Sequence, residues 1–276
     1  MAGFLYSCHV LSEVLTFIFF LLIGLEIREG LKRPNEALLP AGAALGGMIF
    51  PALIFLLINP ASKAWAVAMP TDVALALGAL SLLGRRINPA VRLFLLTLAV
   101  ADDFFSLLVI GIFFREDLHL ASAIYTLGAA AVGFILPLRS ILIKVLTPIA
   151  TFLIIPVYIF INLLTHLDFS LSWERISVSL IIARVLGKVV GITLFAWLLI
   201  KFVKLELPKN LRLQEIAGVG FLAGMGLTVS LVIAEITLTS VSELAQVRIG
   251  LFLAAIISGL LGLAWLKKIT ADVNQS

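Results

Sequence analysis

The sequence predicts an all-α polytopic membrane protein, and three observations support this fold class. Of the 276 residues, 62% are hydrophobic and only 13% are charged, about half the charged share of an ordinary soluble domain. Apolar segments of about 20 residues, the length that crosses a bilayer, recur along the chain. Most charged residues lie in the short segments between them. We therefore expect a single membrane domain over residues 1–276.

Nine membrane-spanning segments are expected, with ends that the sequence places only to within a few residues. They cover residues 10–27, 37–58, 64–84, 91–114, 120–138, 142–165, 176–200, 214–240 and 248–267. The first follows no basic region and no small-residue cleavage site, so it is expected to be a retained span and not a signal peptide.

Basic residues predict the orientation of these spans, because Lys and Arg accumulate in cytoplasmic loops. Of the 20 basic residues, 14 fall on one side of the nine-span arrangement: Arg28, Lys32, Arg33, Arg85, Arg86, Arg92, Arg139, Lys144, Lys201, Lys204, Lys209, Arg212, Lys267 and Lys268. Four fall on the other side: Lys63, Arg115, Arg175 and Arg248. The C-terminus is therefore expected in the cytoplasm and the N-terminus outside.

The remaining composition excludes several classes of function. The net charge of +4 comes from basic residues spread over short loops, which is a topology signal and not a nucleic-acid-binding patch. The single cysteine, Cys8, cannot form a disulfide framework, and three scattered histidines predict no metal cluster. No cofactor and no nucleic-acid partner are expected.

Two of the predicted spans carry interruptions. Pro70 lies at mid-depth in the third span, where it removes a backbone donor and clashes with the preceding turn. A half-helix is therefore expected to begin near Thr71 or Asp72. Gly224 and Gly226 loosen the eighth span, although small residues also serve as a plain packing face between membrane helices.

Each interrupted span is the middle one of three. The first triplet covers residues from about 37 to 114 and starts from the cytoplasm, whereas the second covers about 176–267 and starts from outside. Two inverted triplets with broken middle helices predict a substrate site where the two breaks cross at mid-membrane.

Six charged residues lie inside the apolar spans: Asp72, Asp102, Asp103, Arg184, Lys188 and Glu235. A charge near the bilayer centre costs about 2.5–3.5 kcal/mol, so each should have a partner or face a water-filled cavity. Glu235 is expected near the outer interface, where it can reach water.

Asp102 and Asp103 are the main candidates for an ion site. Burial and the neighbouring like charge both disfavour the ionised form of a carboxylate, so this pair can hold a proton near neutral pH and yield it to a competing cation, as an ion-for-proton exchanger requires. The alternative is a structural pair of carboxylates neutralised by Lys188 or Arg184, which lie one helical turn apart on one face.

Thr71 and Asp72 are residue types typical of a helix N-cap, and an acid suits the positive end of a half-helix. This structural role and a role beside a cation site are compatible, because a dipole that faces a cation must be neutralised. Lys188 is expected to balance helix C-termini or to pair with a buried aspartate.

These residues lie in segments that resemble the NhaA family of sodium/proton antiporters, for which inverted repeats are known. The segments are FFLLIGLEI (19–27), GGMIFPALI (46–54), PTDVALALGALSLLG (70–84), LTLAVADDFFSLLVIGIFF (96–114), GKVVGITLFAWL (187–198) and GFLAGMGLTVSLVIA (220–234). The resemblance implies that Asp102 and Asp103 bind the cation and the proton, and that Lys188 pairs with an aspartate. It also implies that Thr71 and Asp72 lie where one broken helix crosses the other, at Gly224–Thr228.

The chain departs from the family pattern in three places. The family has a helix and a hairpin-bearing loop before the segment that begins here, and three helices where this chain has only its fifth span. Its pair of acids after the GLE motif is altered, because Glu26 is followed by Glu29, and both are candidates for pH sensing. Arg184 adds an unexpected charge. The absent helices belong to the dimer-facing half, which bears on whether a homodimer forms.

The expected function is secondary active exchange of sodium or lithium for protons by alternating access, with membrane lipid as surroundings and no enzymatic activity. One alternative is a degenerate, non-transporting relative. A second is an intramembrane aspartyl protease using Asp72 and Asp103, but the Gly-x-Gly-Asp signature of that class is absent. A third is a retinal protein with Lys188 as the Schiff base, which nine spans disfavour.

Overall fold

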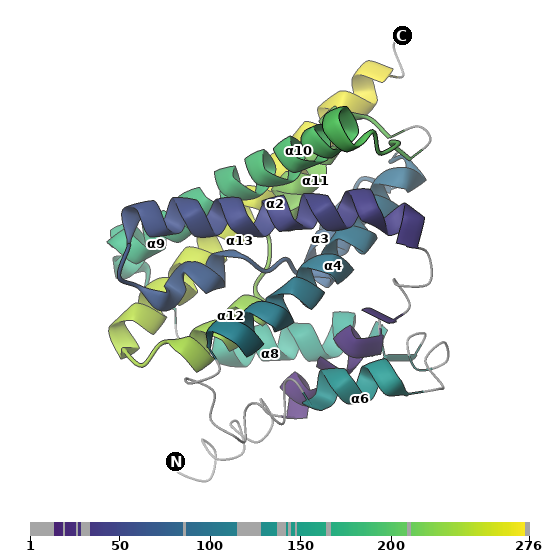
Figure 1. Ribbon diagram of the computed structural model, residues 1–276. Helices are drawn as coiled ribbons and strands as arrows, with labels where there is room; N and C mark the ends of the chain where they lie inside the picture. Colours follow the sequence, from purple (N-terminus) through teal and green to yellow (C-terminus); the bar gives the residue numbers. More distant parts are fainter. Residues whose placement is uncertain are drawn as a thin grey trace.

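The computed structural model describes a helical protein (Figure 1). The described residues are 14–18, 20–25, 27–28, 34–84, 87–114, 128–136, 142, 145–146, 148–163, 167–208 and 211–273. The elements are α2 (Pro34–Ile58), η1 (Lys63–Ala68), α3 (Val73–Ser81), α4 (Pro89–Phe113), α6 (Ala129–Ile135), η4 (Ala150–Ile154), α8 (Ile155–Asn162), η6 (Phe169–Trp173), α9 (Arg175–Ile182), η7 (Ala183–Gly187), α10 (Lys188–Leu198), η8 (Leu199–Val203), α11 (Leu213–Ala223), α12 (Thr228–Thr237) and α13 (Val241–Val273).

Among the described residues, five helical segments are long and apolar enough to cross a membrane, and the bent pair of α11 and α12 makes a sixth if it is counted as one span. The five are Ala37–Ile58, Lys63–Ser81, Pro89–Phe113, Arg175–Val203 and Val241–Ala271. The predicted all-helical membrane class is therefore confirmed. The expected first, fifth and sixth spans fall partly on residues outside the described ranges. The count of nine spans and the inverted repeat accordingly stay predictions.

The third expected span is broken at its proline. The 3-10 helix η1 ends at Ala68, residues 70–72 have no helical conformation, and α3 begins at Val73. The start lies one to two residues later than expected, because Asp72 takes the extended conformation of an N-cap and so stands just outside the helix.

The eighth expected span is also broken. Its halves, α11 and α12, are bent by 49° at the four residues between them. Gly224 forms the C-cap of α11, and Leu227 precedes the first residue of α12. Gly224 and Gly226, the two glycines that the sequence associates with an interruption, both lie within this break.

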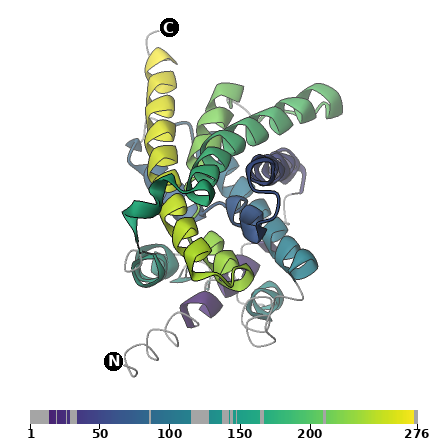
Figure 2. The ribbon, with the colours of Figure 1, turned by 90° about the vertical axis from the view of Figure 1, so that its left-hand side faces the viewer.

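Close helix packing holds the remaining segments around the two breaks. Helix α2 lies along α10, and α13 packs against α9 and α11 (Figures 1 and 2). Gly46 and Gly191 face each other across the α2–α10 contact, where a Cβ on either residue would meet the carbonyl oxygen of the other. Such small residues let helix backbones approach closely in a membrane.

Replacing Gly191 by alanine is expected to lower stability by about 1–3 kcal/mol, the usual effect of overpacking, because the new methyl group would meet the Gly46 carbonyl. Gly78 is the matched control, since a Cβ at this helical position would meet nothing within 4 Å. Gly78→Ala should leave stability unchanged or raise it by up to about 1 kcal/mol through helix propensity. Apparent melting temperatures in detergent would test both changes, and equal values for the two variants would contradict this packing.

Candidate functional site

The two broken helices meet at their breaks. The Thr228 hydroxyl, at the start of α12, donates a hydrogen bond of 2.8 Å to Asp72 Oδ2, and the Thr228 backbone N–H contacts the same oxygen at 3.4 Å. A Cβ on Gly226 would collide with the carbonyl oxygen of Pro70, so only glycine fits where the two backbone segments meet. These contacts bring together the predicted crossing residues of both helices.

Asp72 serves both half-helices through one carboxylate. Its Oδ1 accepts hydrogen bonds from the backbone N–H groups of Ala74 (3.2 Å) and Leu75 (3.3 Å) at the start of α3, and its Oδ2 accepts from Thr228. The residue is 3% exposed. The N-cap predicted for Asp72 is therefore present, and the same side chain joins the first break to the second.

Lys188 and Asp102 form a buried ion pair. The Lys188 Nζ atom lies 3.2 Å from Asp102 Oδ2, and both side chains are 1% exposed. Lys188 also donates to the Thr71 hydroxyl at 2.8 Å and to the carbonyl oxygen of Met69. Removing one partner of such a buried pair typically costs about 3–5 kcal/mol. Lys188 thus links α4 to the first break.

Buried oxygens on α4 lie next to this ion pair. Asp103 is 4% exposed and interacts electrostatically with Lys188. Asp102 Oδ1 and the Ser106 hydroxyl have no hydrogen-bond partner among the described residues, although both residues are buried. Four positions separate Asp102 from Ser106, so they lie on one face of α4. Ser106 was not predicted as a site residue from the sequence, because its uncharged side chain does not stand out within an apolar span.

Arg184 contacts both breaks, a role that the sequence did not predict: it was expected only as an added charge or as a partner of the two aspartates. Its guanidinium donates to the carbonyl oxygens of Val67 (2.8 Å) and Pro70 (2.7 Å) beside the first break. It donates also to the Gly224 carbonyl (3.2 Å) and the Ser230 hydroxyl (2.8 Å) at the second. Arg184 and Lys188 are both fully buried. Arg184 lies in η7, a π-helical segment of the kind often found at functional sites.

The predicted glutamates do not contribute to the described contacts at the crossing. Glu235 forms an ion pair with Arg248 at 3.8 Å, and its side chain is 33% exposed, in agreement with the expected access to water. Glu26 and Glu29, the candidates for pH sensing, lie outside the described residues. Gly224 also serves packing, because a Cβ there would collide with the Ser258 hydroxyl.

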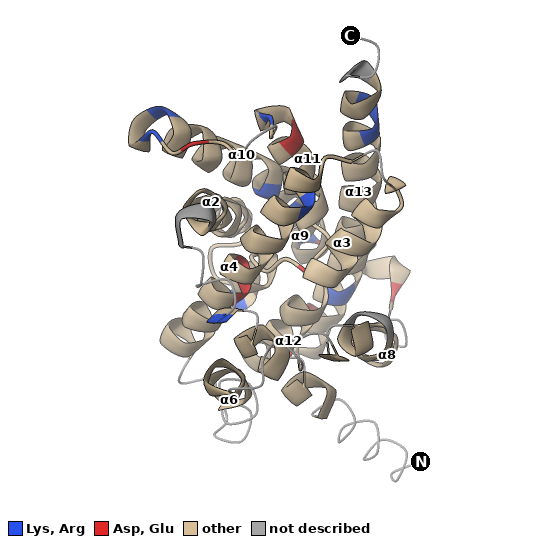
Figure 3. Cartoon of the chain, turned by 90° about the vertical axis from the view of Figure 1, so that its right-hand side faces the viewer, with Lys and Arg blue, Asp and Glu red and all other residues tan. Residues whose placement is uncertain are grey.

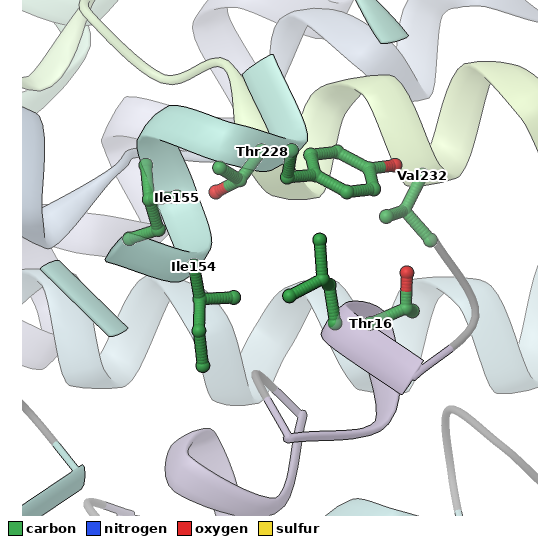
Figure 4. A pocket seen from close by; sticks show the side chains of 7 residues that line it. Thr16, Ile154, Ile155, Thr228 and Val232 are labelled. Atoms are coloured by element: carbon green, nitrogen blue, oxygen red, sulfur yellow. The ribbon is translucent and has the colours of Figure 1, made fainter. Parts of the chain in front are cut away.

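An apolar pocket adjoins the crossing (Figure 4). It is small and is lined by Leu15, Thr16, Ile154, Ile155, Tyr158, Thr228 and Val232. Thr228 therefore borders the pocket and hydrogen-bonds Asp72. The pocket lies between the N-terminal helical segment, α8 and α12 (Figure 4).

Comparison with known proteins identifies the family. Residues 5–146 and 137–266 match the family described as Na+/H+ antiporter 1. The chain belongs to this family. The Na(+)/H(+) antiporter NhaA of Shewanella amazonensis is 32% identical over 327 aligned residues, which cover 96% of this chain and 84% of the relative. The NhaA of Escherichia coli O1:K1 is 31% identical, with 93% and 82% covered, and that of Citrobacter koseri is 30% identical, with 93% and 82% covered.

The family confirms three predictions from the sequence. The resemblance to NhaA antiporters holds over most of the chain, and the chain is a multi-pass bacterial membrane protein. The relatives are named as antiporters, which are transporters and not enzymes, so the protease alternative is excluded. The alignments are longer than the 276-residue chain, and the two family matches overlap at residues 137–146. Both features agree with an internal shortening near the fifth span.

Proposed function

We propose that this protein exchanges sodium or lithium for protons across the bacterial inner membrane, at the carboxylates of Asp102 and Asp103. Family membership supports the exchange reaction. The observation that supports the site is the buried ion pair of Asp102 with Lys188 beside the crossing of two broken helices. Half-helix ends that meet in this way are a recurrent site for substrate and coupling ions in transporters.

The side chains of α4 supply oxygen atoms suited to a hard cation. Asp102 Oδ1 and the Ser106 hydroxyl are buried, and no described residue hydrogen-bonds either atom. A buried polar atom without a partner costs about 1–3 kcal/mol, and a bound cation would remove that cost. Together with Asp103, these atoms form the proposed cation site.

Exchange follows from shared occupancy of the carboxylates. A protonated carboxyl binds sodium poorly, whereas an ionised one binds it and has lost its proton. Sodium at Asp102 must also displace the Lys188 ammonium, which contacts Oδ2 of this carboxylate. Protons and sodium therefore exclude each other, and either can leave on the side to which the site is open.

The crossing provides the frame for alternating access. Asp72 and Thr228 join the two breaks, and Thr71 accepts a hydrogen bond from Lys188. Pro70 interrupts its helix, while Gly226 allows close approach to the Pro70 carbonyl and Gly224 allows close approach to Ser258. Rigid motion of one helix group against another around a fixed site is the general mode of such transporters. Glu26 and Glu29 remain candidates for pH sensing.

The orientation with a cytoplasmic C-terminus rests on the basic residues. Lys201, Lys204, Arg212, Lys267 and Lys268 lie at the ends of η8, α11 and α13, and blue segments gather at that end of the molecule in Figure 3. Large apolar side chains are exposed on the outer surface, with Leu57 83% and Leu82 78% exposed, and lipid would cover them. A homodimer stays a prediction.

Everted membrane vesicles test the exchange directly. Respiration acidifies the vesicle lumen, and sodium added outside should be taken up while protons leave, so the pH gradient should collapse within seconds to minutes. Vesicles from cells that lack the protein are the control. If vesicles that contain folded protein show no response to sodium or lithium, the proposal fails and the non-transporting alternative is favoured.

A further inference from the structure

The Arg184 guanidinium is a buried cation, and each of its three nitrogens donates a hydrogen bond to a residue at or beside a helix break. Nε donates to the Gly224 carbonyl, Nη1 to the Val67 carbonyl and the Ser230 hydroxyl, and Nη2 to the Pro70 carbonyl. Its exposure is 0%. A planar guanidinium presents these donors in a fixed fork, so one side chain holds the two breaks at a set distance.

Its acceptors lie at the negative ends of both interrupted helices. Val67 lies in the last turn of η1 and Pro70 follows it, while Gly224 caps α11. The last carbonyl groups of a helix have no partner within it and carry its partial negative charge. Arg184 therefore satisfies and neutralises the C-terminal ends of the first half of both broken helices.

Lys188 has a different set of partners. Its three donors go to the Met69 carbonyl, the Thr71 hydroxyl and Asp102 Oδ2. A lysine ammonium is a compact charge that can lose its proton, whereas an arginine side chain keeps its charge in proteins. The cation that must leave Asp102 when sodium arrives is thus distinct from the cation that holds the breaks.

We propose that Arg184 is a positioning residue, a permanent clamp that keeps the two breaks together while Asp102 exchanges Lys188 for sodium. This inference rests on the proposed function. Besides Lys188, the charged groups around Arg184 are Asp102 and Asp72, with which it interacts electrostatically, and Asp103, the neighbour of Asp102. The constant positive charge also repels a bound sodium ion, which weakens binding and favours release.

Two variants separate the charge of Arg184 from its hydrogen bonds. Arg184→Met removes both, so the apparent KM for sodium, measured in the alkaline range where sodium affinity no longer changes with pH, should fall about tenfold, the effect of one nearby charge. Its maximal rate should fall at least about tenfold through loss of the clamp. Arg184→Lys keeps the charge but cannot reproduce the fork, so its rate should fall while KM stays within about twofold.

Rates are expressed per folded protein, and sodium-dependent shifts in melting temperature of the purified protein give an affinity that does not depend on transport. Arg92→Met is the matched control, because Arg92 is exposed and donates to the Gly84 carbonyl, far along α4 from Asp102. It should leave rate and KM unchanged. If Arg184→Met does not fold, Arg184→Gln, which removes the charge and keeps amide donors, takes its place.

Two results would overturn the inference. One is a wild-type rate and KM in Arg184→Met or Arg184→Gln. The other is a smaller amount of folded protein both in Arg184→Lys and in the variant without the charge, with rate and KM unchanged per folded molecule. That result would assign Arg184 to folding alone. Absence of exchange in the wild type would refute the proposed function, but sodium-dependent melting would still decide the role of Arg184. Tighter sodium binding without the charge would support it, and unchanged binding would refute it.

Discussion

Replacing Asp103 by asparagine is expected to abolish the sodium response of everted vesicles, with a rate at least about 100-fold below that of the wild type. Asparagine has nearly the size of aspartate, but its amide neither ionises nor holds an exchangeable proton. Both sodium binding and proton binding therefore lose their ligand at this buried position. The measurement is the collapse of a preset pH gradient on addition of sodium.

Asp168→Asn is the matched control, since this aspartate lies in an exposed turn where it accepts hydrogen bonds from Ser170. The control should exchange at the wild-type rate. Equal amounts of folded protein in the membranes must be shown for each variant. Wild-type exchange by Asp103→Asn would place the cation site elsewhere and leave the carboxylate pair with a structural role.

Much of the crossing could be predicted from local sequence. Pro70 must interrupt a helix wherever it falls in the interior of a span, and Asp72 is a cap residue placed directly after it. The structure places the break and the cap there. Adjacent acids in an apolar span had to find a partner, and of the two cations considered it is Lys188 that contacts Asp102.

The role of Arg184 could not be predicted in the same way. Its acceptors are mostly backbone carbonyls, at Val67, Pro70 and Gly224, and every residue carries such a group. These carbonyls become available only because two helices far apart in sequence are both interrupted and packed against the same segment. Helical spacing indicated a shared face for Arg184 and Lys188 but could not assign a separate task to each.

Ser106 shows a second limit of sequence reasoning. A serine inside a helix commonly returns its hydroxyl to a carbonyl one turn earlier, so its presence in a span carries no signal. Here the hydroxyl is buried with no hydrogen-bond partner among the described residues. The spacing of four residues places Ser106 one turn from Asp102, but only the structure shows that its hydroxyl is buried there and not bonded to any described residue.

Competition between protons and sodium is the second large effect that we expect. Sodium binding requires an ionised carboxylate, so the apparent sodium affinity should rise with pH. At pH values where the carboxylates are mostly protonated, it should weaken about tenfold, or about 1.4 kcal/mol, per pH unit for each proton that must leave. Asp102 and Asp103 are adjacent and buried, so they should titrate as a coupled pair whose midpoint belongs to both residues.

This competition does not depend on Glu26 or Glu29. It requires only that cation and proton occupy the same buried carboxylates, which is the central claim about Asp102 and Asp103. Separate pH sensors would change the transport rate and leave the intrinsic competition for the carboxylates in place. Sodium binding to the purified protein therefore separates the site from its regulation.

The most direct test is the apparent sodium affinity of the purified protein, measured between about pH 6 and pH 9, where the predicted slope is about tenfold per pH unit per proton. We expect the affinity to rise steeply with pH and to level off once both carboxylates are ionised. A flat profile in a protein that still transports sodium would contradict the account, because sodium would then bind without displacing a proton from Asp102 or Asp103.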